Sequence, residues 1–169
     1  MEAIPLRLDG LLLVKPRCFE DARGYFFETY RKDAYERLGI STPFVQDNAA
    51  FSKKGVIRGL HYQKTPGQAK LVTAISGAIW DVAVDIRPNS ATYGQWEAVE
   101  LSDENHWQLF IPVGFAHGYC TLSESACVSY KVSAPYDPAT ECTIRWDDPS
   151  FAIPWPSKSP ILSERDRNA

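Results

Sequence analysis

The sequence predicts an all-β protein, a jelly-roll β-barrel with an N-terminal strand extension and one or two short helices. Its apolar residues recur with a period of two over most of the chain, the period of a strand with one buried face. Segments rich in Val, Ile, Trp and Tyr are separated by turn residues about every 8–12 positions, as in sandwiches and barrels. Ten Gly and twelve Pro in 169 residues interrupt the chain too often for a helical bundle.

The N-terminal third is expected to form strands over residues 10–14 and 24–28. The first of these holds five consecutive apolar or near-apolar positions, which would be costly as an exposed sheet edge. A second copy of the chain would cover that edge. We therefore expect a homodimer that uses the N-terminal strands.

One short helix is expected over residues 32–39. Its apolar side chains, Ala34, Tyr35 and Leu38, fall at the spacing of one helix face. Gly39 stands where a helix commonly ends, because glycine accepts the left-handed conformation of the C-terminal cap.

The clearest strand pattern runs over residues 69–87, divided by a turn at Ser76 and Gly77. Alternating Trp, Val and Ile side chains in its second half favour strand over helix. The turn sequence that begins at Pro88 ends this segment. Further strands are expected at residues 96–101, 107–111 and 126–132.

The length of the chain suits a single domain with a sizeable core, expected over residues 1–169. Residues 1–50 would hold the N-terminal strands and the short helix, and would contribute to the dimer. Residues 51–150 would form the jelly-roll core, and residues 151–169 a C-terminal tail.

Charge and cysteine content exclude several classes of protein. Lys and Arg number 18 against 21 Asp and Glu, a net charge of −3 that gives no basic field for nucleic acid. No stretch approaches the roughly 20 apolar residues that span a membrane. The four cysteines contain no C-x-x-C pair, and no secretory signal pattern is seen, so we expect free thiols in the cytoplasm.

The densest polar cluster lies at residues 55–63 and continues to Lys70. Simple strand alternation separates Arg58 from His61 onto opposite faces, although Gly59 is a candidate for a bulge that would change this. A single histidine in a strand is commonly a core residue. Arg58, His61 and Lys70 close together, however, suit the binding of an anion better than a core.

A second cluster at residues 111–118 places His117 in a turn rich in Pro and Gly. Two histidines near barrel turns raise the alternative of a metal site, which would have to draw on the three histidines of the chain. The pattern opposes it, because Gln63 stands two residues after His61 and Lys70 would repel a divalent cation. We expect no metal.

Taken in order, nine segments resemble the dTDP-4-dehydrorhamnose 3,5-epimerase family, whose members are cupin-fold enzymes. The similar segments are Phe19-Glu-Asp-Ala-Arg-Gly-Tyr-Phe-Phe-Glu28, Phe44-Val-Gln-Asp-Asn48, Val56-Ile-Arg-Gly-Leu-His-Tyr-Gln63, Lys70-Leu-Val72, Asp81-Val-Ala-Val-Asp-Ile-Arg87, Ile111-Pro-Val-Gly-Phe-Ala-His-Gly118, Tyr130-Lys131, Trp146-Asp-Asp-Pro149 and Leu162-Ser-Glu-Arg-Asp166. The resemblance covers nearly the whole chain and implies a cupin-type jelly roll.

The resemblance implies epimerisation of a dTDP-4-keto-6-deoxyhexose at C3 and C5, without metal or other cofactor. It makes His61 the base, Asp166 the carboxylate paired with it, Lys70 the cation at the enolate oxygen and Tyr130 the acid. From local pattern alone, Tyr130 would be a packing residue and Asp166 a solvated tail residue.

The same resemblance assigns the nucleotide contacts. Arg23 and Arg58 would lie near the diphosphate, with Arg23 coming from the neighbouring chain through exchanged N-terminal strands. His117 would lie near the diphosphate or the sugar. The remaining expected contacts surround the thymine and are Phe26, Glu28, Gln46 and Asn48.

One segment departs from the family pattern. The family commonly has two adjacent tyrosines where this chain has Pro135 and Tyr136. Proline removes a hydroxyl and fixes the backbone, which bears on nucleotide affinity or choice. Two alternatives to double inversion also stay open on the sequence: an enzyme that inverts only one carbon of a related ketosugar, and a non-catalytic sugar-nucleotide-binding module.

Overall fold

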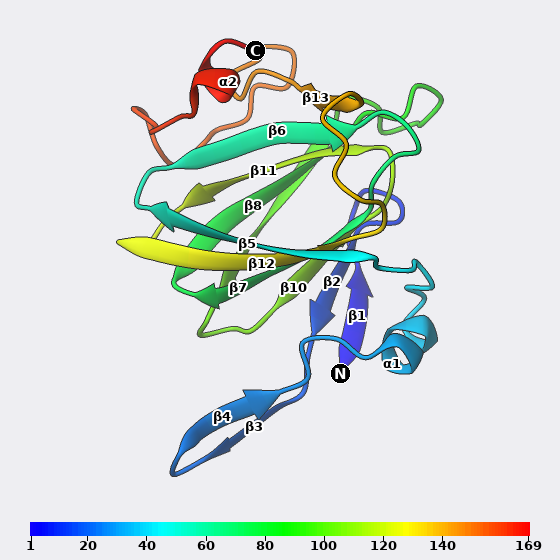
Figure 1. Ribbon diagram of the computed structural model, residues 1–169, viewed down its shortest axis with the longest axis vertical. Coiled ribbons are helices and arrows are strands. Elements are labelled where there is room, and N and C mark those ends of the chain that lie inside the picture. The colour runs from blue at the N-terminus through cyan, green and yellow to red at the C-terminus, as the bar shows by residue number, and fades with distance from the viewer.

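The computed structural model describes residues 1–169 and contains two antiparallel sheets that face each other (Figure 1). The six-stranded sheet has the order β1 (Glu2–Pro5), β2 (Leu12–Lys15), β10 (Gln108–Ile111), β7 (Lys70–Ser76), β12 (Ser125–Val132) and β5 (Gln46–Lys53). The five-stranded sheet has the order β13 (Glu141–Thr143), β6 (Ile57–Gln63), β11 (Phe115–Thr121), β8 (Ala78–Asp85) and β9 (Trp96–Ser102). The predicted cupin-type jelly roll is confirmed.

A two-stranded hairpin and two short helices lie outside these sheets. Strands β3 (Cys18–Asp21) and β4 (Gly24–Phe27) form a separate hairpin that projects away from the barrel (Figure 1). Helix α1 (Lys32–Arg37) confirms the predicted short helix, and Gly39 follows it with φ of +88°. Helix α2 (Glu164–Arg167) is a single turn near the C-terminus.

The main core fills the space between the two sheets and draws on β2, β7 to β12 and the residues before β2. A second cluster packs α1 on the outer face of the six-stranded sheet. A third lies on the outer face of the other sheet, where the segment around Trp155 covers β6, β8 and β11. Both faces of each sheet are thus partly covered, which explains the strongly apolar central strands.

The expected exposed edge at residues 10–14 is wrong. Strand β2 lies between β1 and β10, and the side chains of Leu13 and Val14 are buried within the same chain. One of the two partners of β2, strand β10, lies nearly 100 residues away along the sequence, and no local pattern could identify it. Because this edge is buried within the chain, it does not support a homodimer.

The β3–β4 hairpin is the N-terminal element that does leave apolar surface uncovered. Phe19 is 50% exposed and Phe26 68% exposed. On one face of the hairpin, the ring of His106 lies 4.3 Å from the ring centre of Tyr25 and 5.0 Å from that of Phe27, and His106 is largely buried. An isolated two-stranded hairpin is only marginally stable in water. We therefore expect the exposed face of this hairpin to pack against another surface.

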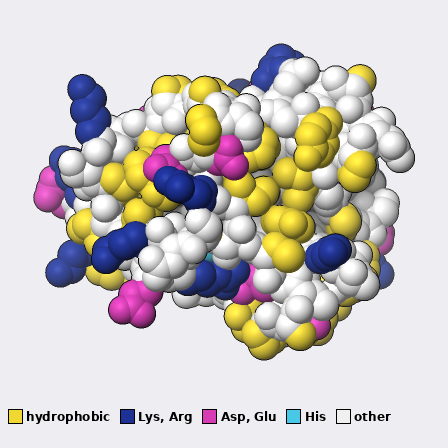
Figure 2. Space-filling view, turned by 90° about the horizontal axis from the view of Figure 1, so that it is seen from above, with side chains coloured by type: hydrophobic (Ala, Val, Ile, Leu, Met, Phe, Trp, Pro, Cys, Tyr) yellow, Lys and Arg dark blue, Asp and Glu magenta, His cyan; other side chains and the backbone are white.

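No helix in the structure is long and apolar enough to cross a membrane. All four cysteines are free. On the face shown in Figure 2, acidic and basic side chains are interspersed among apolar ones, so neither sign of charge dominates it.

Candidate active site

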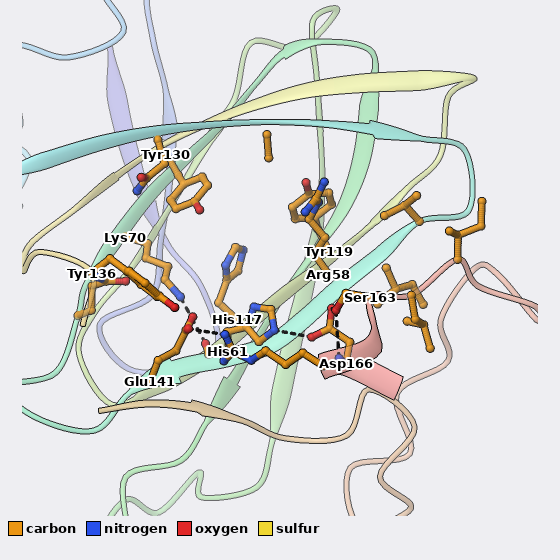
Figure 3. A pocket seen from close by; sticks show the side chains of 18 of the residues that line it. Arg58, His61, Lys70, His117, Tyr119, Tyr130, Tyr136, Glu141, Ser163 and Asp166 are labelled. Carbon is orange, nitrogen blue, oxygen red and sulfur yellow. Dashed lines mark hydrogen bonds and ion pairs between the residues drawn. The ribbon is translucent and has the colours of Figure 1, made fainter. Parts of the chain in front are cut away.

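A cavity of about 650 Å³ opens at one end of the barrel, between the two sheets. Strands β5, β7 and β12 form one wall, and β6 and β11 form the opposite wall. The C-terminal segment around α2 closes one side (Figure 3). The pocket thus combines residues that lie far apart in the sequence, from Gln46 to Asp166.

Strand pairing explains why one wall is polar. Tyr130 pairs with Val72 on one side and Asn48 on the other, while Val132 pairs with Lys70 and Gln46. Paired residues share a face, as do residues two apart along a strand. Gln46, Asn48, Lys70 and Tyr130 therefore all project from the inner face of the six-stranded sheet.

The opposite wall depends on a bulge in β6. His117 pairs with His61, but Tyr119 pairs with Arg58, so β6 has one more residue than β11 between these pairs. The extra residue reverses the alternation, and Arg58 and His61 both line the pocket. The bulge suggested by Gly59 is confirmed, and the simple alternation that separated Arg58 from His61 is wrong.

Gly59 is needed because the backbone of β11 lies directly against it. Its φ is +125°, and a Cβ there would lie 2.5 Å from Gly118 Cα and 2.7 Å from the carbonyl oxygen of His117. Since the obstacles are backbone atoms, the contact cannot be relieved by a side-chain movement.

Gly59→Ala is accordingly expected to lower the free energy of unfolding by about 1–3 kcal/mol, through overpacking and backbone strain. Urea denaturation would measure the change. Gly94→Ala is the matched control, because Gly94 also has a positive φ (+77°) but has nothing within 4 Å of an added Cβ. Equal losses in the two variants would show that close approach is not the cause.

His61 and Asp166 form a short contact in the pocket. His61 Nε2 lies 2.5 Å from Asp166 Oδ1 (Figure 3). Asp166 is only 3% exposed, unlike a solvated tail residue, whereas the His61 side chain is 26% exposed. Burial raises the pKa of Asp166, but the hydrogen bonds with His61 and Ser163 outweigh this and lower it below its usual value. A carboxylate thus faces one imidazole nitrogen, and Nδ1 remains to exchange a proton.

Lys70 lies beside this pair, and its ammonium donates to the carbonyl oxygen of His61 at 3.3 Å. Burial lowers the pKa of Lys70 from 10.5 to about 8, although the charges of Glu141 and Asp81 act in the opposite direction. At neutral pH the group is therefore a buried cation that can stabilise a negative charge developing on a bound ligand.

Tyr130 projects into the pocket from the wall opposite His61 (Figure 3). Burial raises the pKa of its hydroxyl, against the opposing effect of the nearby Arg58. The phenol is therefore protonated at neutral pH and available as a proton donor.

His117 lies in the middle of β11, not in the turn where the sequence suggested it, because the turn ends at Gly114. Its Nε2 is 2.9 Å from both carboxylate oxygens of the fully buried Asp81. Burial lowers the pKa of His117, and Asp81 acts against that shift. Asp81 thus fixes the ring, a role that the local sequence pattern does not indicate.

The other expected binding residues divide into two groups. Gln46, Asn48, Arg58 and His117 line the pocket. Gln46 Nε2 donates to Asn48 Oδ1 at 2.8 Å, and Arg58 Nε donates to Ser52 Oγ at 3.0 Å.

Three residues, Arg23, Phe26 and Glu28, do not line the pocket of their own chain. Arg23 is at the tip of the β3–β4 hairpin, 91% exposed and paired with Asp21. Glu28 directly follows β4 and lies 3.5 Å from Arg31.

Sequence reasoning missed two charged residues of the pocket, Glu141 and Arg165. Arg165 forms an ion pair with Glu141 and its Nε donates to Thr143 Oγ1 at 2.6 Å. The pairing crosses more than 20 residues and depends on where the tail folds back, which no local spacing reveals. Tyr136, next to the unusual Pro135, also lines the pocket, and its backbone N–H donates to Gln46 Oε1 at 3.0 Å.

Neither this pocket nor the rest of the chain contains a group of three or more His, Cys, Asp and Glu side chains placed to hold a metal ion. The chemistry available in the pocket is proton transfer. It offers an imidazole paired with a carboxylate, a buried cation and a protonated phenol.

A sequence model of the family described as dTDP-4-dehydrorhamnose 3,5-epimerase matches residues 5–169. A dTDP-4-dehydrorhamnose 3,5-epimerase from Methanothermobacter thermautotrophicus is 48% identical over 168 residues, covering 98% of this chain and 91% of the relative. A dTDP-4-dehydrorhamnose 3-epimerase from Streptomyces niveus is 40% identical, covering 100% of this chain and 83% of the relative.

Among solved structures, the 3,5-epimerase from Legionella pneumophila in complex with dTDP-4-keto-L-rhamnose superimposes with a TM-score of 0.96. It is 46% identical, and the alignment covers 99% of this chain and 90% of that chain. The similarity thus extends over the barrel, the hairpin and the C-terminal segment together.

Proposed function

The chain belongs to the dTDP-4-dehydrorhamnose 3,5-epimerase family, and from this membership we propose how its own residues perform the family's reaction. The protein is an isomerase that converts dTDP-4-dehydro-6-deoxy-D-glucose to dTDP-4-dehydro-L-rhamnose. The observation that carries the mechanism is the facing arrangement of His61, with Lys70 beside it, and Tyr130.

The reaction chemistry sets what the pocket must supply. C3 and C5 flank the C4 ketone, so removal of either proton gives an enolate. Inversion then needs a base on one face of the sugar, a positive charge at the ketone oxygen and an acid on the other face.

His61 is the proposed base. Asp166 fixes the ring through Nε2 and stabilises the imidazolium that forms when Nδ1 accepts a proton. Lys70 is the proposed cation at the C4 oxygen, where its burial excludes the water that would weaken its effect.

Tyr130 is the proposed acid. It projects from the six-stranded sheet, whereas His61 projects from the five-stranded sheet. A sugar ring between these sheets would present opposite faces to the two groups. Return of the proton from the face opposite to its removal inverts the carbon.

Nucleotide binding is assigned to the remaining polar residues of the wall. We propose that Arg58 and His117 contact the diphosphate or the sugar, and that Gln46 and Asn48 frame the thymine. The close contact between the Tyr136 backbone and Gln46 supports a binding role for the segment that carries Pro135. Cofactors are not required by this chemistry.

We further propose that the enzyme is a homodimer with exchanged N-terminal strands. The exposed Phe19 and Phe26, on a hairpin whose strands pair with no strand of the barrel, favour burial against a second copy. Arg23, Phe26 and Glu28 of one chain would then reach the pocket of the other. The free thiols of all four cysteines agree with a cytoplasmic location.

Mixed dimers test the exchange of strands. With substrate kept below the wild-type KM, Arg23→Ala is expected to lower activity by weakening diphosphate binding, and His61→Ala to lower it by about 10²–10⁴-fold. After unfolding and refolding together, the two variants are expected to regain activity, because one site of each mixed dimer has both wild-type residues. Activity no higher than the sum of the separate variants would contradict strand exchange.

The product distinguishes double from single inversion, which the same base and acid could also perform. An NADPH-dependent reductase specific for the L-lyxo ketosugar should consume the product only after both carbons are inverted. We expect NADPH oxidation that depends on both enzymes. Formation of an epimer that the reductase does not accept would instead assign the chain to the single-inversion relatives.

A further inference from the structure

Asp166 depends on a very short structural element. Helix α2 has four residues, far fewer than an isolated helix needs for stability in water. Nevertheless, the carboxylate of Asp166 must reach His61, which lies 105 residues earlier in the chain. Something outside the helix must therefore fix Asp166.

The segment before α2 is held to the barrel by its backbone. Ile161 donates to the carbonyl oxygen of Gly55 at 3.0 Å and accepts from the N–H of Ile57 at 3.1 Å. This parallel bridge fixes the position at which the last segment begins. It does not determine the rotation of the Asp166 side chain.

Ser163 is placed to determine the rotation of the Asp166 side chain. As the N-terminal cap of α2, its Oγ accepts from the backbone N–H of Asp166 at 3.1 Å. The same hydroxyl donates to Asp166 Oδ2 at 2.9 Å (Figure 3). Since Asp166 Oδ1 contacts His61, each carboxylate oxygen has its own partner. This geometry holds the carboxylate in one orientation.

We propose that Ser163 is a positioning residue of the epimerase, whose hydroxyl orients the Asp166 carboxylate toward His61. The proposal rests on the proposed function of His61 and Asp166 as base and partner. Ser163 itself lines the pocket only at its edge with the C-terminal segment, and its effect would pass through Asp166.

Three substitutions separate orientation of the Asp166 carboxylate from capping of α2. Ser163→Ala removes the hydroxyl and also the helix cap. Ser163→Gly removes the hydroxyl but leaves a residue that caps almost as well as serine. Ser163→Thr keeps the hydroxyl. We expect kcat to fall about 10- to 100-fold in Ser163→Ala and Ser163→Gly, because each loses one hydrogen bond to a charged group. KM should change little in both variants. Ser163→Thr should have a near-normal kcat.

The inference would be overturned by a wild-type kcat in Ser163→Ala, or by loss in Ser163→Ala with a wild-type kcat in Ser163→Gly, which would reveal capping alone. If Ser163→Ala does not fold, the Gly and Thr variants still decide the question. Their thermal unfolding is measured beside kcat, so that a fall in kcat at unchanged stability is attributed to orientation.

A double-mutant cycle with Asp166→Asn tests whether Ser163 acts through Asp166. We expect Ser163→Gly to add little to the defect of Asp166→Asn, whereas full additivity would contradict the inference. Failure of the proposed function is distinguishable, because wild-type enzyme and Asp166→Asn would then show no difference in turnover. A slow Asp166→Asn variant with an unaffected Ser163→Gly variant would reject only the role of Ser163.

Discussion

Replacement of His61 by alanine is expected to lower the rate of epimerisation by about 10²–10⁴-fold, the usual contribution of a positioned base. No other group takes its place, because Lys70 donates to the backbone and Tyr130 lies on the opposite wall. Exchange of the C3 and C5 protons with solvent deuterium measures proton abstraction directly. The loss should appear at both carbons.

The control for His61→Ala is binding of dTDP, which should remain close to that of the wild-type protein. The imidazole contacts Asp166 and is not among the proposed nucleotide contacts. Near-normal deuterium exchange in a variant that binds dTDP normally would remove His61 from the mechanism.

Replacement of Lys70 by methionine is expected to lower kcat by about 10²–10³-fold, as for other groups that stabilise an oxyanion. Methionine fills most of the volume of the buried side chain, so the loss reflects charge more than packing. KM should change little, because the negative charge at the C4 oxygen develops only in the transition state. Steady-state kinetics with the coupled reductase would measure both constants.

The pH profile provides the control for Lys70. Because its pKa is lowered to about 8, the ammonium is present below that pH and is lost above it. Wild-type activity should therefore fall as pH rises through about 8, and this alkaline limb should be absent in Lys70→Met. The same limb in both proteins would assign the titration to another group.

The barrel could be predicted because strand periodicity is local. Alternation of apolar residues and the positions of turn residues predict the bounds of β7, β8, β9, β10 and β12 to within one or two residues. Local pattern failed where a strand's partner is distant, as for β2, whose neighbour β10 buries the edge expected to face a second copy.

The active site could be predicted only in part from local pattern. The cluster of Arg58, His61 and Lys70 pointed to anion binding, but the bulge at Gly59 decides that the first two share the pocket. The family resemblance identifies Asp166, whose position beside His61 depends on the fold of the tail. Glu141 and Arg165 were not anticipated because their ion pair forms only after that tail has folded back.

If this pocket inverts both carbons beside the C4 ketone by proton abstraction and return, each inverted carbon takes up hydrogen from the solvent. Incubation of dTDP-4-dehydro-6-deoxy-D-glucose with the wild-type protein in D₂O, followed by NMR at C3 and C5, tests it most directly. We expect deuterium at both positions of a dTDP-4-dehydro-L-rhamnose product. Deuterium at one carbon alone, or inversion without incorporation from solvent, would contradict double inversion by proton abstraction and return.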